Sequence, residues 1–259
     1  MSQPSDQNST ERFSNLAEVY SRCRPNYPPA AIDFVLQRCS LTPGNRLVDV
    51  GSGTGISSRL FAQRGLIVVG IEPNEAMRTE AENTTGSNSE LQVSYQQGTA
   101  ESTGLPEATC DAILAAQAFH WFEPTPTLRE FLRILKPGGW LVLMWNERDE
   151  SDSFTREYGE VIRQFPNSPQ IESMRSGAGD VLLEFPEFHD ATRDTFPNQQ
   201  VLDEEGMIGR AFSASYAPRD PETVAIVTER FREIFQTHQK DEAVAIQYET
   251  SVYTAQARK

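Results

Sequence analysis

The sequence predicts an α/β protein built on a doubly wound, mostly parallel sheet, and three observations lead to this fold class. An apolar run at 47–50 leads directly into three alternating glycines. Further apolar runs of strand length recur over the first 150 residues, and segments with helical periodicity separate them. Strands that alternate with helices in this way form parallel pairs with right-handed crossovers.

The elements expected in the first part of the chain follow this alternation in order. A helix is expected at 30–39, because two prolines precede it and Pro43-Gly44 ends it. The run at 110–116 is apolar almost throughout, as expected for a strand covered on both faces. The remaining strands are expected at 46–50, 66–71, 91–96 and 140–145, and the remaining helices at 56–64, 74–83 and 126–136.

After Asn146 the sequence changes character. A charged helical stretch at 147–174 and a glycine-containing break at 176–179 precede an alternating strand at 185–202. A helix at 221–239 and a last strand at 243–253 follow. Residues 203–240 are long for a connection, so we expect a helical cap there. The expected divisions are a disordered tail (1–12), an N-terminal helical lid (13–45), a cofactor-binding core (46–150) and a C-terminal part completing the sheet (151–259).

Composition limits the function classes. The chain has 259 residues and a net charge of −14, and only three of its 23 basic residues are lysines. Nucleic acid and anionic membranes are therefore not expected as partners, whereas a small-molecule substrate is. The three cysteines are scattered, which indicates reduced thiols in a cytoplasmic protein and no metal site. The longest apolar runs are too short to span a membrane.

The glycine turn indicates a nucleoside cofactor. Its pattern is D-x-G-x-G-x-G from Asp49 to Gly55, and the next apolar run ends at Glu72. A carboxylate at that place can accept hydrogen bonds from both hydroxyls of a ribose, although Glu72 also suits the start of the following helix. A dinucleotide fold needs its third glycine at position 56, which is Ile56. A nicotinamide-dependent Rossmann oxidoreductase and a non-catalytic cofactor-binding protein remain the alternatives.

This pattern resembles motif I of the class I S-adenosylmethionine-dependent methyltransferases. The N-terminal run from Tyr20 to Pro28 and the A-Q-A-F-H-W-F run at 116–122 resemble the trans-aconitate methyltransferase-like (methyltransferase type 11) group. The resemblance implies a seven-stranded Rossmann-like sheet whose last strand is antiparallel, with S-adenosylmethionine as cofactor. The cofactor-binding residues that it implies are Tyr20, Arg24, Asp49, Gly51, Ser52, Gly53, Thr54, Glu72, Pro73, Met77, Ala100, Glu101 and Gln117.

The implied reaction is methyl transfer to a small-molecule acceptor, with a carboxylate as the favoured class. His120 is the histidine best placed for catalysis, either as a general base or as part of the pocket wall with Phe119, Trp121 and Phe122. Arg24 is expected to hold a carboxylate, either that of the cofactor's methionyl end or that of the acceptor. The sequence identifies neither the acceptor nor the atom that is methylated.

Overall fold

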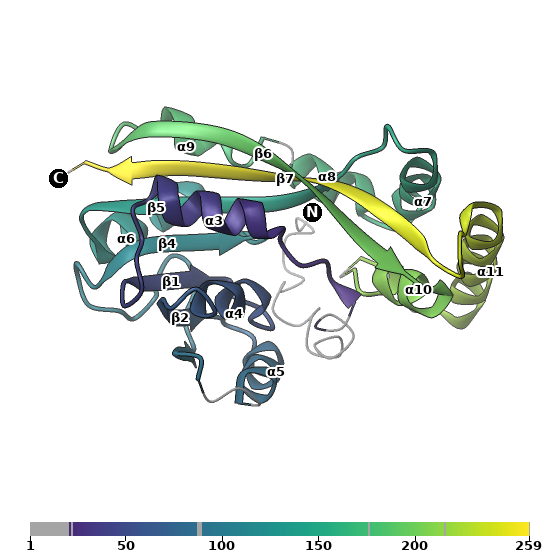
Figure 1. The fold of residues 1–259 in the computed structure, drawn as a ribbon, viewed down its shortest axis with the longest axis horizontal. Coiled ribbons are helices and arrows are strands. Elements are labelled where there is room, and N and C mark those ends of the chain that lie inside the picture. Colours follow the sequence, from purple (N-terminus) through teal and green to yellow (C-terminus); the bar gives the residue numbers. More distant parts are fainter. Residues whose placement is uncertain (1–20, 22, 87–89, 176, 215, 259) are drawn as a thin grey trace, which may run out of the picture.

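The computed structural model describes residues 21, 23–86, 90–175, 177–214 and 216–258, so the predicted tail lies outside it. A seven-stranded sheet with the order β3-β2-β1-β4-β5-β7-β6 runs through the molecule (Figure 1). The strands from β3 to β5 are parallel to their neighbours, and β7 is antiparallel to both β5 and β6. The predicted fold class is confirmed, including the antiparallel last strand.

The elements agree with the predicted order. The strands are β1 (Arg46–Val50), β2 (Ile67–Ile71), β3 (Val93–Gln96), β4 (Cys110–Ala116), β5 (Leu135–Arg148), β6 (Phe188–Leu202) and β7 (Val244–Ala257). The helices are α3 (Pro29–Arg38), α4 (Ile56–Ala62), α5 (Glu75–Gly86), the 3-10 turn η1 (Phe119–Trp121), α6 (Pro124–Ile134), α7 (Ser153–Arg163), α8 (Ser168–Arg175), α9 (Asp180–Glu184), α10 (Glu204–Phe212) and α11 (Pro221–His238).

Apolar side chains on both faces of the sheet form two hydrophobic clusters. One cluster includes Val35 of α3 and Phe61 of α4, and the other includes Phe131 of α6. Alternate residues of β4 contribute to each cluster, since successive side chains of a strand point to opposite faces. The nearly continuous apolar sequence of β4 therefore reflects burial on both sides.

A third hydrophobic cluster lies in the C-terminal part, which we call the cap (α7, α10, α11 and the first half of β7). Its helices begin after Asp152, Asp203 and Asp220, and each aspartate accepts a hydrogen bond from a backbone N–H of the first turn. In Figure 1, the long strands β6 and β7 run from the core into the cap. The cap is therefore continuous with the sheet.

Some element bounds differ from those predicted. The fifth strand was expected at 140–145, but β5 extends from Leu135 to Arg148. Pro137, Gly138 and Gly139 form an irregularity within it, because Leu135 pairs with Cys110 and the regular pairing with β4 resumes only at Trp140 with Ala112. The side chain of Gln256 donates a hydrogen bond to the Gly138 carbonyl there. The helix α9, which precedes β6, was not predicted.

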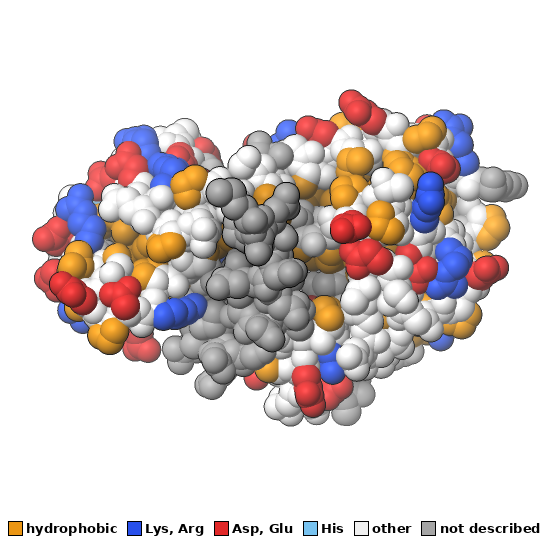
Figure 2. All heavy atoms as spheres, turned by 180° about the vertical axis from the view of Figure 1, so that it is seen from behind, with side chains coloured by type: hydrophobic (Ala, Val, Ile, Leu, Met, Phe, Trp, Pro, Cys, Tyr) orange, Lys and Arg blue, Asp and Glu red, His pale blue; other side chains and the backbone are white. Residues whose placement is uncertain are grey.

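The molecular surface carries charges of both signs. On the face that Figure 2 shows, Lys and Arg side chains are scattered among Asp and Glu and form no single basic patch. None of the described helices is long and apolar enough to cross a membrane.

Candidate functional site

A cavity lies where the core, the cap and the N-terminal segment (residues 23–28) meet. It spans about 1040 Å³ of space, with the open solvent at its mouth included. The carboxyl ends of β1 and β4 open into it, as expected for ligand sites of open α/β sheets. Its lining comprises Arg24, Pro25, Tyr27, Gly51, Ser52, Gly53, Thr54, Ile56, Ser57, Glu72, Pro73, Met77, Ala116, Gln117, Ala118, Trp121, Phe122, Asn146, Arg175 and Arg210.

The turn after β1 exposes its backbone to this cavity. Gly53 has a φ of +54°, a conformation that residues with a side chain rarely adopt. A Cβ atom at this position would meet no other atom within 4 Å, so crowding by the protein does not explain the glycine. The missing side chain leaves the backbone open to a ligand.

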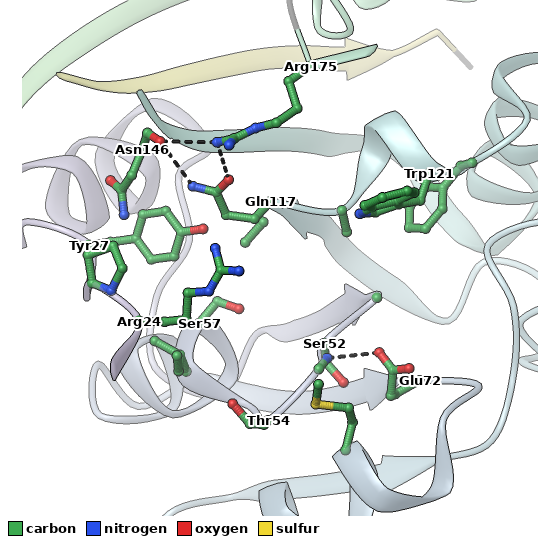
Figure 3. A pocket seen from close by; sticks show the side chains of 18 of the residues that line it. Arg24, Tyr27, Ser52, Thr54, Ser57, Glu72, Gln117, Trp121, Asn146 and Arg175 are labelled. Carbon is green, nitrogen blue, oxygen red and sulfur yellow. Dashed lines mark hydrogen bonds between the residues drawn. The ribbon is translucent and has the colours of Figure 1, made fainter. Parts of the chain in front are cut away.

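Glu72 holds this turn from the end of β2. One carboxylate oxygen accepts the Gly53 N–H at 2.9 Å (Figure 3). The other accepts the Asn74 N–H at 2.9 Å. Burial raises the pKa of Glu72, while the two backbone hydrogen bonds oppose that shift. The position of Glu72 is thus compatible with a ribose-binding role, because it lines the cavity. It is also compatible with a role at the start of α5, because it binds Asn74, the residue directly before that helix.

Asp49 lies behind the turn and does not line the cavity. Its carboxylate accepts hydrogen bonds from the hydroxyls of Ser57 at 2.7 Å and Ser58 at 2.6 Å, in the first turn of α4. Its other oxygen is buried without a hydrogen-bond partner. Burial raises the pKa of Asp49 to about 6, although both serines favour the charged form. In the structure Asp49 thus anchors α4 beneath the turn.

The polar wall opposite Glu72 centres on Gln117 and Arg175. Gln117 follows β4 and has a left-handed backbone with a φ of +58°, which is unusual for a residue with a side chain. The Arg175 guanidinium, at the end of α8, donates to the Gln117 side-chain oxygen at 2.7 Å and to the Asn146 carbonyl at 3.1 Å (Figure 3). Strained backbone positions of this kind cluster at functional sites.

The N-terminal segment contacts both the core and the cap. The Arg24 guanidinium donates to the Ser213 carbonyl at 3.1 Å, just after α10. The Asn26 carbonyl accepts hydrogen bonds from Asn146 of β5 and Asn198 of β6, at 3.2 and 2.8 Å. This segment therefore closes one side of the cavity, with Arg24 and Tyr27 directed into it (Figure 3).

His120 is half-buried beside the cavity and is not part of its lining. Its Nδ1 accepts a hydrogen bond from the Trp145 indole at 3.3 Å. Burial lowers the pKa of His120 to about 3, and the charges of Arg175 and Arg24 contribute to that shift. An imidazole with such a pKa is a weak base at neutral pH, so the base role remains a prediction without support from this environment.

The structure brings together eleven of the residues predicted to bind cofactor or to form the pocket wall. These cavity-lining residues are Arg24, Gly51, Ser52, Gly53, Thr54, Glu72, Pro73, Met77, Gln117, Trp121 and Phe122. Tyr20 lies outside the described residues. Five predicted residues do not line the cavity, and they are Asp49, Ala100, Glu101, Phe119 and His120. Ala100 and Phe119 are in the hydrophobic core, whereas the Glu101 carboxylate accepts from the Glu123 N–H at 3.2 Å.

Five polar or charged lining residues were not predicted, and they are Tyr27, Ser57, Asn146, Arg175 and Arg210. Asn146 directly follows the expected strand at 140–145, so the rule that ligands bind at the carboxyl ends of strands points to it. Tyr27 lies in the N-terminal segment, within the run already singled out. Arg175 and Arg210 have no local sequence signal, because only the tertiary fold brings α8 and α10 to the cavity. The described residues hold no group of three or more His, Cys, Asp or Glu that could bind a metal ion.

The strand order, the glycine turn and the acid after β2 define a Rossmann-like methyltransferase fold. Residues 48–143 match the family model described as "Methyltransferase domain". An uncharacterized methyltransferase of Mycobacterium tuberculosis is 34% identical over 227 residues, which cover 87% of this chain and 86% of that protein. The chain therefore belongs to the class I S-adenosylmethionine-dependent methyltransferases.

Solved structures show the same fold at low sequence identity. A protein from Anaeromyxobacter dehalogenans that carries the name type II methyltransferase has a TM-score of 0.60 and 23% identity. The match covers 91% of this chain and 97% of that one. A Haemonchus contortus phosphoethanolamine N-methyltransferase, solved with S-adenosylhomocysteine, has a TM-score of 0.54 and 16% identity. That match covers 98% of this chain and 58% of the other.

Proposed function

We propose that this chain binds S-adenosylmethionine and transfers its methyl group to a small organic acid. The observation that carries this proposal is the pairing of Glu72 with the open Gly53 backbone, in a chain of the methyltransferase family. When bound, S-adenosylmethionine supplies a methyl group on a sulfonium and leaves as S-adenosylhomocysteine. Glu72 would accept the ribose hydroxyls, and Arg24 would bind the methionyl carboxylate.

The described residues fit this cofactor without large changes. Glu72 retains acceptor capacity on both oxygens, since each carboxylate oxygen can accept more than one hydrogen bond. Met77 and Phe122 give the cavity an apolar surface near the turn, which suits a purine ring. Trp121 offers an aromatic face, and such faces attract cations such as a sulfonium.

A carboxylate acceptor agrees with the environment of His120. At neutral pH a carboxylate carries no proton, so its methylation does not need a general base. The chain would then act mainly by orienting two bound molecules and by excluding water. The three cysteines are unpaired and buried, and on that basis we also propose a cytoplasmic location.

Isothermal calorimetry tests the cofactor assignment. We expect S-adenosylhomocysteine to bind and nicotinamide dinucleotides not to bind, because Ile56 stands where the dinucleotide motif needs glycine. Glu72→Ala should weaken binding of S-adenosylhomocysteine by about 1.5–3 kcal/mol, as expected for lost charged hydrogen bonds. Glu75→Ala, at an exposed acid on α5, is the matched control and should bind like the parent. Dinucleotide binding without S-adenosylhomocysteine binding would favour the oxidoreductase alternative instead.

A further inference from the structure

The cavity has the opposite charge to the molecule that surrounds it. Among the described residues, three arginines and one acidic residue line it. The arginines are Arg24 in the N-terminal segment, Arg175 on α8 and Arg210 on α10, and the single acid is Glu72. Since Glu72 lies at the glycine turn, the opposite wall has no carboxylate among the described lining residues. This wall attracts anions within a chain of net charge −14.

Arg175 and Arg210 have no ionic partners among the described residues. The ion pairs found there include Arg148, which contacts Glu150 and Glu172, but neither Arg175 nor Arg210. The side chain of Arg175 donates only to the neutral oxygens of Gln117 and Asn146 in the hydrogen bonds described. Both side chains are half-buried, and partly desolvated charges are normally paired, so two such guanidiniums on one cavity wall favour an anionic ligand.

Arg210 gives a second, independent indication that this wall binds an anion. Its Nε is buried without a hydrogen-bond partner. Burial lowers the pKa of Arg210, but the phenols of Tyr248, Tyr158 and Tyr216 outweigh burial and raise it above its ordinary value. None of these neighbouring groups is a carboxylate. Its position in the cavity lining leaves the guanidinium accessible to a bound molecule.

The electrostatic environment of Arg175 also favours a bound anion. Burial lowers the pKa of Arg175, and the like charges of Arg24, Arg148 and Arg210 lower it further. Such mutual repulsion is costly in a partly desolvated site, and an anion between the guanidiniums would relieve it. Arg24 is assigned to the cofactor's methionyl carboxylate above, so the charges of Arg175 and Arg210 remain for the second ligand.

We propose that Arg175 and Arg210 form the anion-binding part of the acceptor pocket and select a small carboxylate as the methyl acceptor, an inference that rests on the proposed function. The planar guanidinium fork matches a carboxylate in a bidentate geometry. Gln117, held by Arg175, adds a side-chain amide beside the same position. Helix α8 and the cap would thus supply the acceptor site, whereas the core supplies the cofactor site.

Binding to the complex with S-adenosylhomocysteine tests this proposal without knowledge of the natural acceptor. Succinate and citrate serve as carboxylate probes, with inorganic phosphate as a third probe, in calorimetric titrations at fixed ionic strength. We expect at least one carboxylate to bind to the parent complex. Arg175→Gln and Arg210→Gln should each weaken this binding by about ten- to hundredfold, the effect of a lost charge-assisted hydrogen bond.

Controls separate this role from a structural one. Arg230→Gln removes an equal charge from an exposed ion pair with Glu233 on α11, and it should bind carboxylate like the parent. Arg175→Lys keeps the charge but loses the fork, so it should bind carboxylate more weakly than the parent while melting at the same temperature. Affinity for S-adenosylhomocysteine should remain unchanged in both glutamine variants.

The outcomes are distinguishable. Failure of S-adenosylhomocysteine to bind to the parent would contradict the proposed function itself. If S-adenosylhomocysteine binds but neither carboxylate does, the carboxylate assignment is overturned, including when phosphate alone binds. Equal carboxylate affinities in the parent and in both glutamine variants would also overturn the role of the two arginines.

Discussion

Asp49 shows how a single buried residue is held at a cost to stability. Two serine hydroxyls donate to one of its oxygens, yet burial still dominates and raises its pKa to about 6. The charged form is thus less stable in the folded protein than in the unfolded chain. The compensating gain is local geometry, because Asp49 fixes the first turn of α4 beneath the glycine turn that faces the cavity.

This arrangement predicts a pH dependence of stability. The pKa of Asp49 is about 6 in the folded protein and 3.8 ordinarily, so the folded state binds the proton more tightly between these values. The contribution of Asp49 to stability is full below about pH 4 and falls as the pH rises through about 6, by about 3 kcal/mol in total. The unfolding free energy of the parent, minus that of Asp49→Asn, should therefore decrease as the pH rises.

Carbon-13 NMR of the Asp49 carboxyl group gives the direct measurement, with an expected midpoint near pH 6. Urea unfolding of the parent and of Asp49→Asn at several pH values measures their unfolding free energies. Asp33→Asn, at an exposed acid on α3, controls for general charge effects. An ordinary carboxyl midpoint would contradict the inferred desolvation.

At the scale of elements, the β1–α4 turn was predictable because its determinants are local. The apolar run and the alternating glycines all lie within ten residues, and they specify the turn through backbone conformation. The cap helices are also marked locally, by aspartate N-caps. The extension of β5 to Leu135 was missed because the pairing of Leu135 with Cys110 lies beyond the local turn at Pro137 and Gly138, and the strand includes that turn as an irregularity.

Two glycines of this turn should respond differently to substitution. Both Gly53 and Gly55 have positive φ, so alanine at either position costs about 1–2 kcal/mol of backbone strain. A Cβ on Gly55 would also overlap the Tyr95 hydroxyl, whereas one on Gly53 meets nothing. We expect Gly55→Ala to lose about 3 kcal/mol or more, because overlap in a packed region adds to the strain.

Chemical denaturation of the two variants measures this difference. The Tyr95→Phe background removes the overlapping oxygen, so Gly55→Ala should be less damaging there than in the parent. Gly53→Ala serves as the matched comparison, and its cost should not depend on Tyr95. Conversely, Gly53→Ala should reduce affinity for S-adenosylhomocysteine, since its Cβ would enter the open side of the turn. Equal stability losses in both variants would contradict the overlap at Gly55.

At the scale of the whole molecule, the cavity depends on parts of the chain that are distant in sequence. Arg24, Gln117, Arg175 and Arg210 come from the N-terminal segment, the end of β4, α8 and α10. The half of the site near the glycine turn could be predicted, because a motif specifies it. Arg175 of α8 and Arg210 of α10 could not, since no local pattern distinguishes them from solvent-exposed arginines of other amphipathic helices.

The continuity of the sheet also predicts how the molecule unfolds. β7 contributes Val244, Ile246 and Tyr248 to the cap cluster, and its second half to the two core clusters. Core and cap therefore share one long strand, which pairs with β6 along its length and with β5 from Tyr248 to Gln256. A part that shares such a strand cannot unfold without disrupting the sheet, so we expect one cooperative thermal transition.

Two spectroscopic signals can test this prediction. The three tryptophans, Trp121, Trp140 and Trp145, lie in the core, so their fluorescence reports on it, whereas far-ultraviolet circular dichroism includes the cap helices. Both signals should change at one temperature. S-adenosylhomocysteine at about 100 times its dissociation constant should raise that temperature by about 5–10 °C, since it stabilises the folded state by about 2.7 kcal/mol. An earlier loss of helical signal, with the tryptophan transition unshifted, would show that the cap unfolds on its own and that β7 does not couple it to the core.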